Sequence, residues 1–326
     1  MKKIYGNLAI SQAIEEEMLR DDKVVLIGHD QGRYGGSFGV TQTVYDRFGS
    51  ERVFDMPISE GGFTGLAIGA AITGLRPIME VQFNDWITLA MDQLVNNGSI
   101  LKYMTGGAIS VPMVLRTNCG GYLAGAAQHS KMMESMLAYF PGIKVVMGST
   151  PADMKGLMKA AIRDNNPVVC LEHKKLYATR GEVTDDPDYI VPIGKADVKK
   201  PGTDVSIITY SYEVHLALKA AKELAEEGIS VEVLDLRTIR PLDKEAILES
   251  VTKTGRALCL TEGYAPFSVM SEVSAIIAEN IPGALKKPVI RYGAKDCPIP
   301  YSPVLENFVL PDVEGIKAAV RTLMQD

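Results

Sequence analysis

The sequence is poor in cysteine, with four in 326 residues, at positions 119, 170, 259 and 297. No two of them form a Cys-x-x-Cys pair, so their spacing favours neither a disulfide framework nor a cysteine metal cluster. A reducing cytoplasm is therefore the expected location.

Long apolar runs and excess positive charge are also missing. The longest apolar stretch, 65–75, falls short of the roughly 20 residues that span a bilayer. Acidic residues at 15–17 precede any apolar run, so no signal peptide is expected. The net charge of -6 supplies no basic surface for a phosphate backbone. We expect neither a membrane nor a nucleic acid as a partner.

Buried strands and amphipathic helices alternate along the chain. This alternation predicts an α/β fold with two doubly wound domains, each built on a parallel sheet. A stretch rich in charge and turn formers interrupts the pattern, and the expected limits are 1–180, a linker at 181–192, and 193–326. Helices are expected at 7–20, 61–74, 85–103, 151–164, 213–228, 243–253 and 313–324, and strands at 23–27, 77–81, 111–115, 143–147, 168–171, 204–209, 230–234 and 256–260.

Three short runs contain candidate functional residues. Pro57-Ile-Ser-Glu-Gly-Gly-Phe63 places Glu60 at a predicted helix start, where the helix dipole favours a charged carboxylate. An aromatic follows in Gln82-Phe-Asn-Asp-Trp86, and a histidine in Gln128-His-Ser130. Taken singly, each has a structural interpretation: a helix-terminal acid, a core aromatic, and a turn before a helix.

Together with other runs in the same order, these motifs resemble the beta subunit of the thiamin diphosphate-dependent decarboxylase component of 2-oxo acid and acetoin dehydrogenase complexes. The resemblance covers essentially the whole chain. It implies an N-terminal thiamin pyrimidine-binding domain and a C-terminal transketolase-like domain. The other matching runs are Gly74-Leu-Arg-Pro77, Met91-Asp-Gln-Leu94, Pro141-Gly-Ile-Lys-Val145, Ala161-Ile-Arg-Asp-Asn-Asn-Pro167, Pro192-Ile-Gly-Lys195 and Asp235-Leu-Arg-Thr-Ile-Arg-Pro-Leu-Asp243.

The resemblance assigns a role to each candidate. Glu60 would hydrogen-bond the pyrimidine ring of thiamin diphosphate and activate the cofactor, and Trp86 would stack on that ring. Ile58 and Gln82, from the same two runs, are expected to line the cofactor site. His129 would face the substrate, where a group that titrates near neutral pH can relay a proton.

The resemblance also implies a structural potassium ion held by backbone carbonyls of two loops. Two ordinary connecting turns are the alternative interpretation of the same segments. The expected ligands are Val111, Met113, Val114, Ala161, Asp164 and Asn166.

One motif of a complete thiamin enzyme is missing. The sequence has no Gly-Asp-Gly upstream of an Asn-Asn pair, the arrangement that holds magnesium against the diphosphate. The resemblance therefore implies an alpha subunit that supplies Mg²⁺ and the diphosphate side, in an alpha2-beta2 heterotetramer with a beta-beta dimer. The chain would be an oxidoreductase subunit that is active only with its alpha partner. The assembled enzyme would transfer the acyl group of the substrate to the lipoyl-lysine of an acyltransferase core.

Two residues depart from the family pattern. His29 stands where the family usually has an acid. Because such acids help protons move between the active sites of the family, His29 puts that role in doubt. Trp86 stands where phenylalanine or tyrosine is usual. The substrate stays open among pyruvate, branched-chain 2-oxo acids and acetoin, with the segments at 172–177 and 300–303 leaning toward acetoin or pyruvate. The alternative functions are the C-terminal half of a split transketolase and a noncatalytic subunit that recruits the acyltransferase core.

Overall fold

The computed structural model describes residues 1–325, which form two compact units. The first unit comprises Met1–Cys119 and Met136–Ile193. The second comprises Gly120–Ser135 and the described residues from Gly194 onward. Segment 120–135 thus packs with the second unit, although it lies within the first half of the sequence. No helix within residues 1–325 has the length and apolar character needed to cross a membrane.

The first unit contributes strands in the order β6-β7-β5-β4-β2-β3 to a parallel sheet. Gly28 pairs with Glu80, so β2 and β4 end at the same edge of the sheet. Carboxyl ends of parallel strands are the usual place for ligands in such sheets. The strands are β2 (Val24–Gly28), β3 (Val53–Asp55), β4 (Arg76–Val81), β5 (Val114–Cys119), β6 (Lys144–Val146) and β7 (Val168–His173), with an antiparallel pair formed by β1 (Lys2–Tyr5) and β8 (Arg180–Val183).

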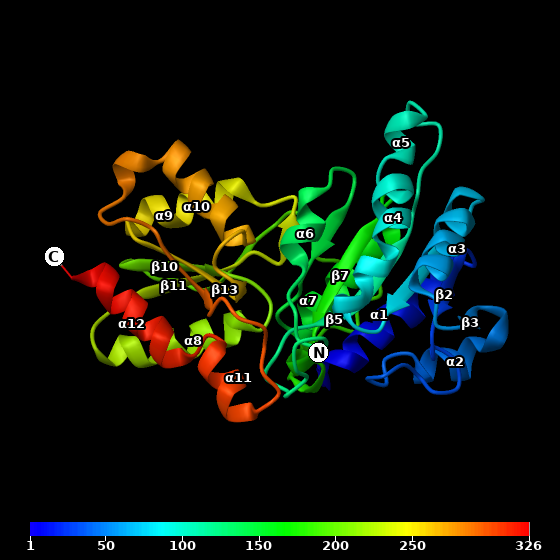
Figure 1. Ribbon diagram of the computed structural model, residues 1–326, viewed down its shortest axis with the longest axis horizontal. Coiled ribbons are helices and arrows are strands. Elements are labelled where there is room, and N and C mark those ends of the chain that lie inside the picture. Colours follow the sequence, from blue (N-terminus) through cyan, green and yellow to red (C-terminus); the bar gives the residue numbers. More distant parts are fainter. Residues whose placement is uncertain (326) are drawn as a thin grey trace. The chain divides into compact units, whose positions relative to one another are not determined.

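Helices of the first unit pack on this sheet. Helix α3 contacts both β4 and β2, and Figure 1 shows it next to β2. Helix α1 packs against α7, with Lys155 and Lys159 of α7 paired to Glu16 of α1 at 2.6 Å each. The helices are α1 (Gly6–Arg20), α2 (Gln42–Phe48), α3 (Glu60–Ile72) and α7 (Pro151–Arg163), with 3-10 turns η1 (Gly49–Glu51) and η4 (Lys174–Ala178). The short helix α6 (Glu134–Tyr139) begins in segment 120–135 and ends in the first unit.

The second unit has a sheet of strand order β14-β13-β10-β11-β9. All of its strand pairs are parallel except the edge pair of β11 and β9. Figure 1 shows α9 and α10 on one face of this sheet and α8 and α12 on the other. The elements are β9 (Asp197–Lys200), β10 (Val205–Thr209), α8 (Glu213–Glu226), β11 (Val231–Asp235), β12 (Thr238–Arg240), α9 (Lys244–Thr254), β13 (Ala257–Tyr264), α10 (Val269–Asn280), η5 (Pro282–Ala284), β14 (Ile290–Ala294), α11 (Pro303–Val309) and α12 (Val313–Met324).

Parallel sheets with helices on both sides confirm the predicted α/β fold. The buried apolar runs are the reason, because strands covered on both faces need apolar side chains in both directions. Every residue of β2 and of β10 is buried.

The prediction of a single helix at 85–103 is wrong. The chain instead forms 3-10 helix η2 (Asn84–Ala90), a short turn α4 (Met91–Gln93), π-helix η3 (Leu94–Gly98) and α5 (Leu101–Met104). Asn96, Asn97 and Gly98 have low helix propensity. The Ser99 hydroxyl also donates to the Val95 carbonyl at 2.8 Å, a local bond that competes with regular helix geometry.

The strand predicted at 111–115 begins later than expected, at Val114, and continues to Cys119. Pro112 explains the late start, because it has no N–H to donate to a neighbouring strand. The Met113 N–H turns back to the Val111 carbonyl instead, at 2.9 Å.

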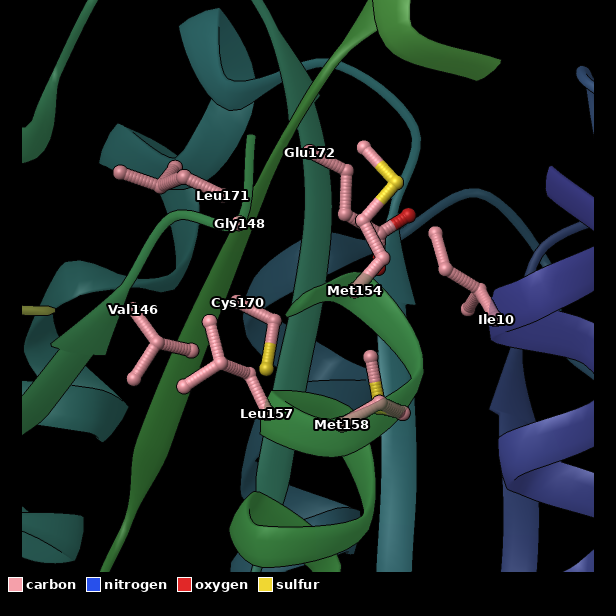
Figure 2. A pocket seen from close by; sticks show the side chains of 9 residues that line it. All are labelled: Ile10, Val146, Gly148, Met154, Leu157, Met158, Cys170, Leu171 and Glu172. Atoms are coloured by element: carbon pink, nitrogen blue, oxygen red, sulfur yellow. The ribbon is translucent and has the colours of Figure 1, made fainter. Parts of the chain in front are cut away.

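A small cavity lies between β6, β7 and α7, and Figure 2 shows the side chains around it. Its volume is about 20 Å³, which is room for a single water molecule. Apart from the Glu172 carboxylate its lining is apolar and rich in sulfur, from Met154, Met158 and Cys170. A substrate or cofactor cannot fit here, so the candidate site lies elsewhere.

Candidate active site

A larger pocket opens in the first unit, where β2 and β4 end and α3 and η2 begin. Its volume is about 260 Å³. Four residues predicted for the cofactor site come together in it, two from the run 57–63 and two from the run 82–86. The pocket is lined by His29, Ile58, Glu60, Phe63, Glu80, Gln82, Trp86 and Leu89.

Glu60 is the first residue of α3 and is 9% exposed. Its side chain therefore lies at the positive end of the helix dipole. Within the described part of the chain its carboxylate accepts no hydrogen bond, whereas its backbone carbonyl accepts one from the Thr64 hydroxyl at 2.5 Å. The carboxylate is therefore available to a ligand in the pocket.

Trp86 is half-buried on η2 and forms part of the pocket wall. Its ring lies edge-to-face with Phe83, with the centroids 5.1 Å apart, a favourable geometry for an aromatic pair. The indole is thus fixed by the protein while part of it lines the pocket. A flat aromatic ligand that also needs a carboxylate partner fits these two residues, and the aminopyrimidine of thiamin diphosphate is such a ligand.

Gln82 and His29 form another side of the pocket. The Gln82 amide donates to the His29 carbonyl at 3.2 Å, and Gln31 donates to the same oxygen at 2.9 Å. The His29 Nε2 atom lies 3.4 Å from an Asp30 carboxylate oxygen, so the imidazole has a charged neighbour whenever it is protonated. These two amides fix the backbone that presents His29 to the pocket.

Glu80 was not among the predicted site residues, yet it lines the pocket. Burial raises the pKa of its carboxyl group, which the adjacent Arg116 guanidinium partly offsets. Arg116 is fully buried and donates to Glu80 at 2.6 Å and to Glu172 at 2.7 and 2.8 Å. The Tyr177 hydroxyl donates to Glu172 at 2.7 Å. The sequence did contain a signal for Glu80, because it is a charged residue inside the otherwise apolar strand predicted at 77–81.

His129 belongs to segment 120–135 of the second unit. Its side chain is half-buried, and its backbone N–H donates to the Ala126 carbonyl at 3.4 Å. The structure therefore places three of the predicted cofactor-binding residues, Ile58, Gln82 and Trp86, around Glu60, and places His129 in a separate unit.

In the two loops predicted to hold potassium, several backbone carbonyls already accept hydrogen bonds from the protein. The Val111 carbonyl accepts from Met113, the Met113 carbonyl from Val168, and the Ala161 carbonyl from Asp164, at 2.9–3.2 Å. The Asp164 carbonyl accepts from the Arg76 guanidinium at 2.6 Å. A carbonyl oxygen that accepts one hydrogen bond keeps a second lone pair for a cation. These bonds therefore do not decide whether the loops bind potassium, and the potassium site stays a prediction.

The side chain of Asp164 is also engaged in this region. It pairs with Lys144 and accepts from the Asn166 backbone at 2.9 Å. Burial alone would raise the pKa of the Asp164 carboxyl, but these hydrogen bonds hold it below its usual value. Among residues 1–325, no group of three or more His, Cys, Asp or Glu side chains is arranged to hold a metal ion.

Comparison with protein families matches both halves of the chain. The model described as "Transketolase, pyrimidine binding domain" matches residues 2–180, and "Transketolase, C-terminal domain" matches residues 194–316. A solved structure described as a split gene transketolase, inactive beta4 tetramer, superimposes with a TM-score of 0.81 over 98% of both chains. Its sequence identity is 24%, so this likeness concerns the fold alone.

Curated relatives share more of the sequence. The 2-oxoisovalerate dehydrogenase subunit beta of Bacillus subtilis is 46% identical over 97% of both chains. An acetoin:2,6-dichlorophenolindophenol oxidoreductase subunit beta of Cupriavidus necator is 42% identical over 99% of this chain and 98% of its own. The Bacillus subtilis pyruvate dehydrogenase E1 component subunit beta is 41% identical over 97% of both. The chain therefore belongs to the transketolase-like family of beta subunits of thiamin diphosphate-dependent 2-oxo acid and acetoin dehydrogenases.

Proposed function

We propose that this chain is the catalytic beta subunit that, with an alpha partner, decarboxylates a 2-oxo acid or cleaves acetoin and passes the acyl unit to lipoyl-lysine of an acyltransferase core. The observation that carries the proposal is the unengaged Glu60 carboxylate at the head of α3, in the same pocket as the Trp86 indole. The names of the relatives support the same class of reaction.

Four of the pocket residues have a role in this proposal. Thiamin diphosphate, when bound, supplies a thiazolium carbon that serves as an electron sink. Glu60 would hold a proton at the pyrimidine ring nitrogen of the cofactor. Trp86 would support the face of that ring, and Ile58 and Gln82 would hold its orientation.

His129 is proposed to hold or relay a proton at the substrate. Imidazole suits this role because its usual pKa lies near neutral pH.

The remaining parts of the assembly belong to the proposal as well. Mg²⁺ and the diphosphate side are assigned to the alpha subunit, because this sequence has no Gly-Asp-Gly. We also propose that two alpha and two beta subunits form an alpha2-beta2 heterotetramer in which the beta subunits contact each other. A potassium ion is proposed at the loops of Val111 and Asp164. Three buried free cysteines and the exposed Cys297 suit a reducing cytoplasm.

Two other functions are less well supported. The split transketolase half has fold-level support, at 24% identity, whereas the dehydrogenase subunits match at 41–46%. A noncatalytic recruiting subunit would have no need of an unengaged buried carboxylate in a pocket of 260 Å³.

The test is Glu60→Gln in the assembled complex. Glutamine keeps the volume and a hydrogen-bonding group but cannot share a proton as a carboxyl can. Proton–deuterium exchange at the thiazolium carbon should slow by at least ~10²–10⁴, the range for a positioned proton-transfer group. Glu51→Gln, an exposed acid in η1, is the matched control and should exchange at the wild-type rate. A wild-type rate in a fully assembled Glu60→Gln complex would show that Glu60 is only a helix-terminal acid.

A further inference from the structure

The backbone before His129 adopts an unusual conformation. Tyr122, Ala124 and Ala126 have positive φ values of 62°, 53° and 58°, alternating with residues of ordinary φ. L-residues disfavour this left-handed region, because Cβ approaches the following carbonyl. Such a conformation persists only where surrounding groups impose it, and it is most frequent at functional sites.

Two buried carboxylates bind the backbone of this loop. The Gly121 N–H donates to Glu262 of β13 at 2.6 Å, and the Ala124 N–H donates to Glu306 of α11 at 2.9 Å. Both acids are 2% exposed. A Cβ at Gly121 would lie 2.6 Å from a terminal methyl group of Leu310, so a larger residue here would displace that side chain.

A third attachment passes through the Tyr122 side chain. Its hydroxyl lies 2.9 Å from a carboxyl oxygen of Glu213 on α8 and 2.9 Å from the Pro311 carbonyl. One hydroxyl hydrogen cannot serve two acceptors, so both bonds form fully when Glu213 is protonated and donates to Tyr122. Burial, reinforced by the charge of Glu262, raises the pKa of Glu213 well above its usual value, in keeping with this arrangement.

The loop is in direct contact with His129. A Cβ on Gly125 would lie 3.0 Å from the His129 carbonyl and 3.3 Å from its Cβ, so the two backbones approach closely. The His129 N–H donates to Ala126, and Gly120 donates to the Lys131 carbonyl at 3.2 Å, which closes the loop at its base. A shift of residues 121–126 therefore displaces His129.

We propose that Tyr122, Glu213, Glu262 and Glu306 are positioning residues that impose the left-handed backbone of residues 120–126 and so hold His129 in place for catalysis. The inference rests on the proposed function of His129. These four residues are assigned no contact with the reacting atoms. They act through the backbone that carries the imidazole.

The experiment is a double-mutant cycle of Tyr122→Phe and His129→Ala in the complex assembled with its alpha subunit. Pyruvate, 2-oxoisovalerate and acetoin serve as substrates, with 2,6-dichlorophenolindophenol as electron acceptor. Tyr122→Phe keeps the ring but removes the hydroxyl, so kcat should fall about three- to tenfold, the value of one hydrogen bond, with KM unchanged. In the His129→Ala background the same change should have no further effect on kcat.

Three additional variants and one physical measurement complete the test. Tyr301→Phe removes a hydroxyl from an exposed tyrosine of the same unit and should leave kcat unchanged. Glu306→Gln keeps an oxygen that can accept from Ala124, so its kcat should stay near wild type, whereas Glu306→Leu should lower it. Hydrogen exchange of the peptide 120–131 in the beta chain alone should be faster in Tyr122→Phe than in Tyr301→Phe.

The outcomes separate the two proposals. If His129→Ala leaves kcat unchanged, the proposed role of His129 is wrong and this inference is wrong with it. If His129→Ala lowers kcat but Tyr122→Phe lowers it by the same factor in both backgrounds, the role of His129 stands and the positioning proposal is overturned. An unchanged kcat for Tyr122→Phe in the wild-type background also overturns it.

Discussion

Trp86 is half-buried, lies edge-to-face with Phe83, and lines the pocket that contains Glu60. Replacing it with alanine should weaken thiamin diphosphate binding, since an aromatic contact contributes ~0.5–1.5 kcal/mol beyond the buried area. Trp86→Phe should recover most of that affinity. Calorimetric titration of the assembled complexes, beside their melting temperatures, checks both expectations.

The opposite result has an equally clear meaning. A tryptophan that only fills the core costs roughly 3–5 kcal/mol of stability when truncated to alanine. A large loss of melting temperature with unchanged cofactor affinity would therefore assign Trp86 to the core.

Arg116 neutralises two buried acids, Glu80 on β4 and Glu172 on β7. Arg116→Met should lower the free energy of unfolding by about 3–5 kcal/mol, because both carboxylates lose their buried partner. The loss should shrink as the pH falls, because burial already raises the pKa of the Glu80 carboxyl and its protonation removes that charge. Urea unfolding of the beta chain at neutral and mildly acidic pH measures this. Arg180→Met, at an exposed site, is the control, and an equal loss in both variants would contradict the expectation.

At the scale of elements, α8 carries Glu213 toward loop 120–126, and this contact should depend on pH. The folded-state pKa of Glu213 is raised above the usual 4.5, by burial first and by Glu262 second. A raised pKa means that the folded state binds more protons, so stability falls as the pH rises from 4.5 through the folded pKa. For each tenfold difference in the acid dissociation constant between the folded and unfolded states, the loss is about 1.4 kcal/mol.

Glu213→Gln should remove this dependence. The glutamine amide can donate to Tyr122 as the protonated carboxyl does, yet it never becomes charged beside Glu262. The variant should match wild type near pH 5 and exceed its stability near pH 8, as judged by melting temperature. Glu226→Gln, on the exposed side of the same helix, should keep the wild-type pH slope. Parallel curves for Glu213→Gln and wild type would show that Glu213 is charged in the folded protein.

For the whole molecule, the absent Gly-Asp-Gly leads to a prediction about assembly. The purified beta chain should be a homodimer without dehydrogenase activity and with weak thiamin diphosphate affinity. Mixing it with the alpha subunit should give a two-plus-two heterotetramer. Light scattering gives the masses, and calorimetry gives the affinity. Tight, magnesium-dependent binding to the beta chain alone would contradict the division of the cofactor site between the subunits.

The sequence by itself determined the elements whose pattern is local. Buried strands such as 24–28 and 205–209 appear as apolar runs, and helices such as 151–163 carry Thr-Pro at their start, where Thr150 caps the helix by accepting from Asp153. The ordered motifs also identified the family and directed attention to Glu60 and Trp86, because their residue types and spacing are properties of the sequence alone.

Only the tertiary structure decided which distant residues meet. Arg116 is 36 positions from Glu80 and 56 from Glu172, and no local pattern pairs them. The same holds for Tyr122 and Glu213, 91 positions apart, and for the packing of 120–135 with the second unit. The physical reason is that such contacts form between side chains whose separation along the chain carries no information about their separation in space.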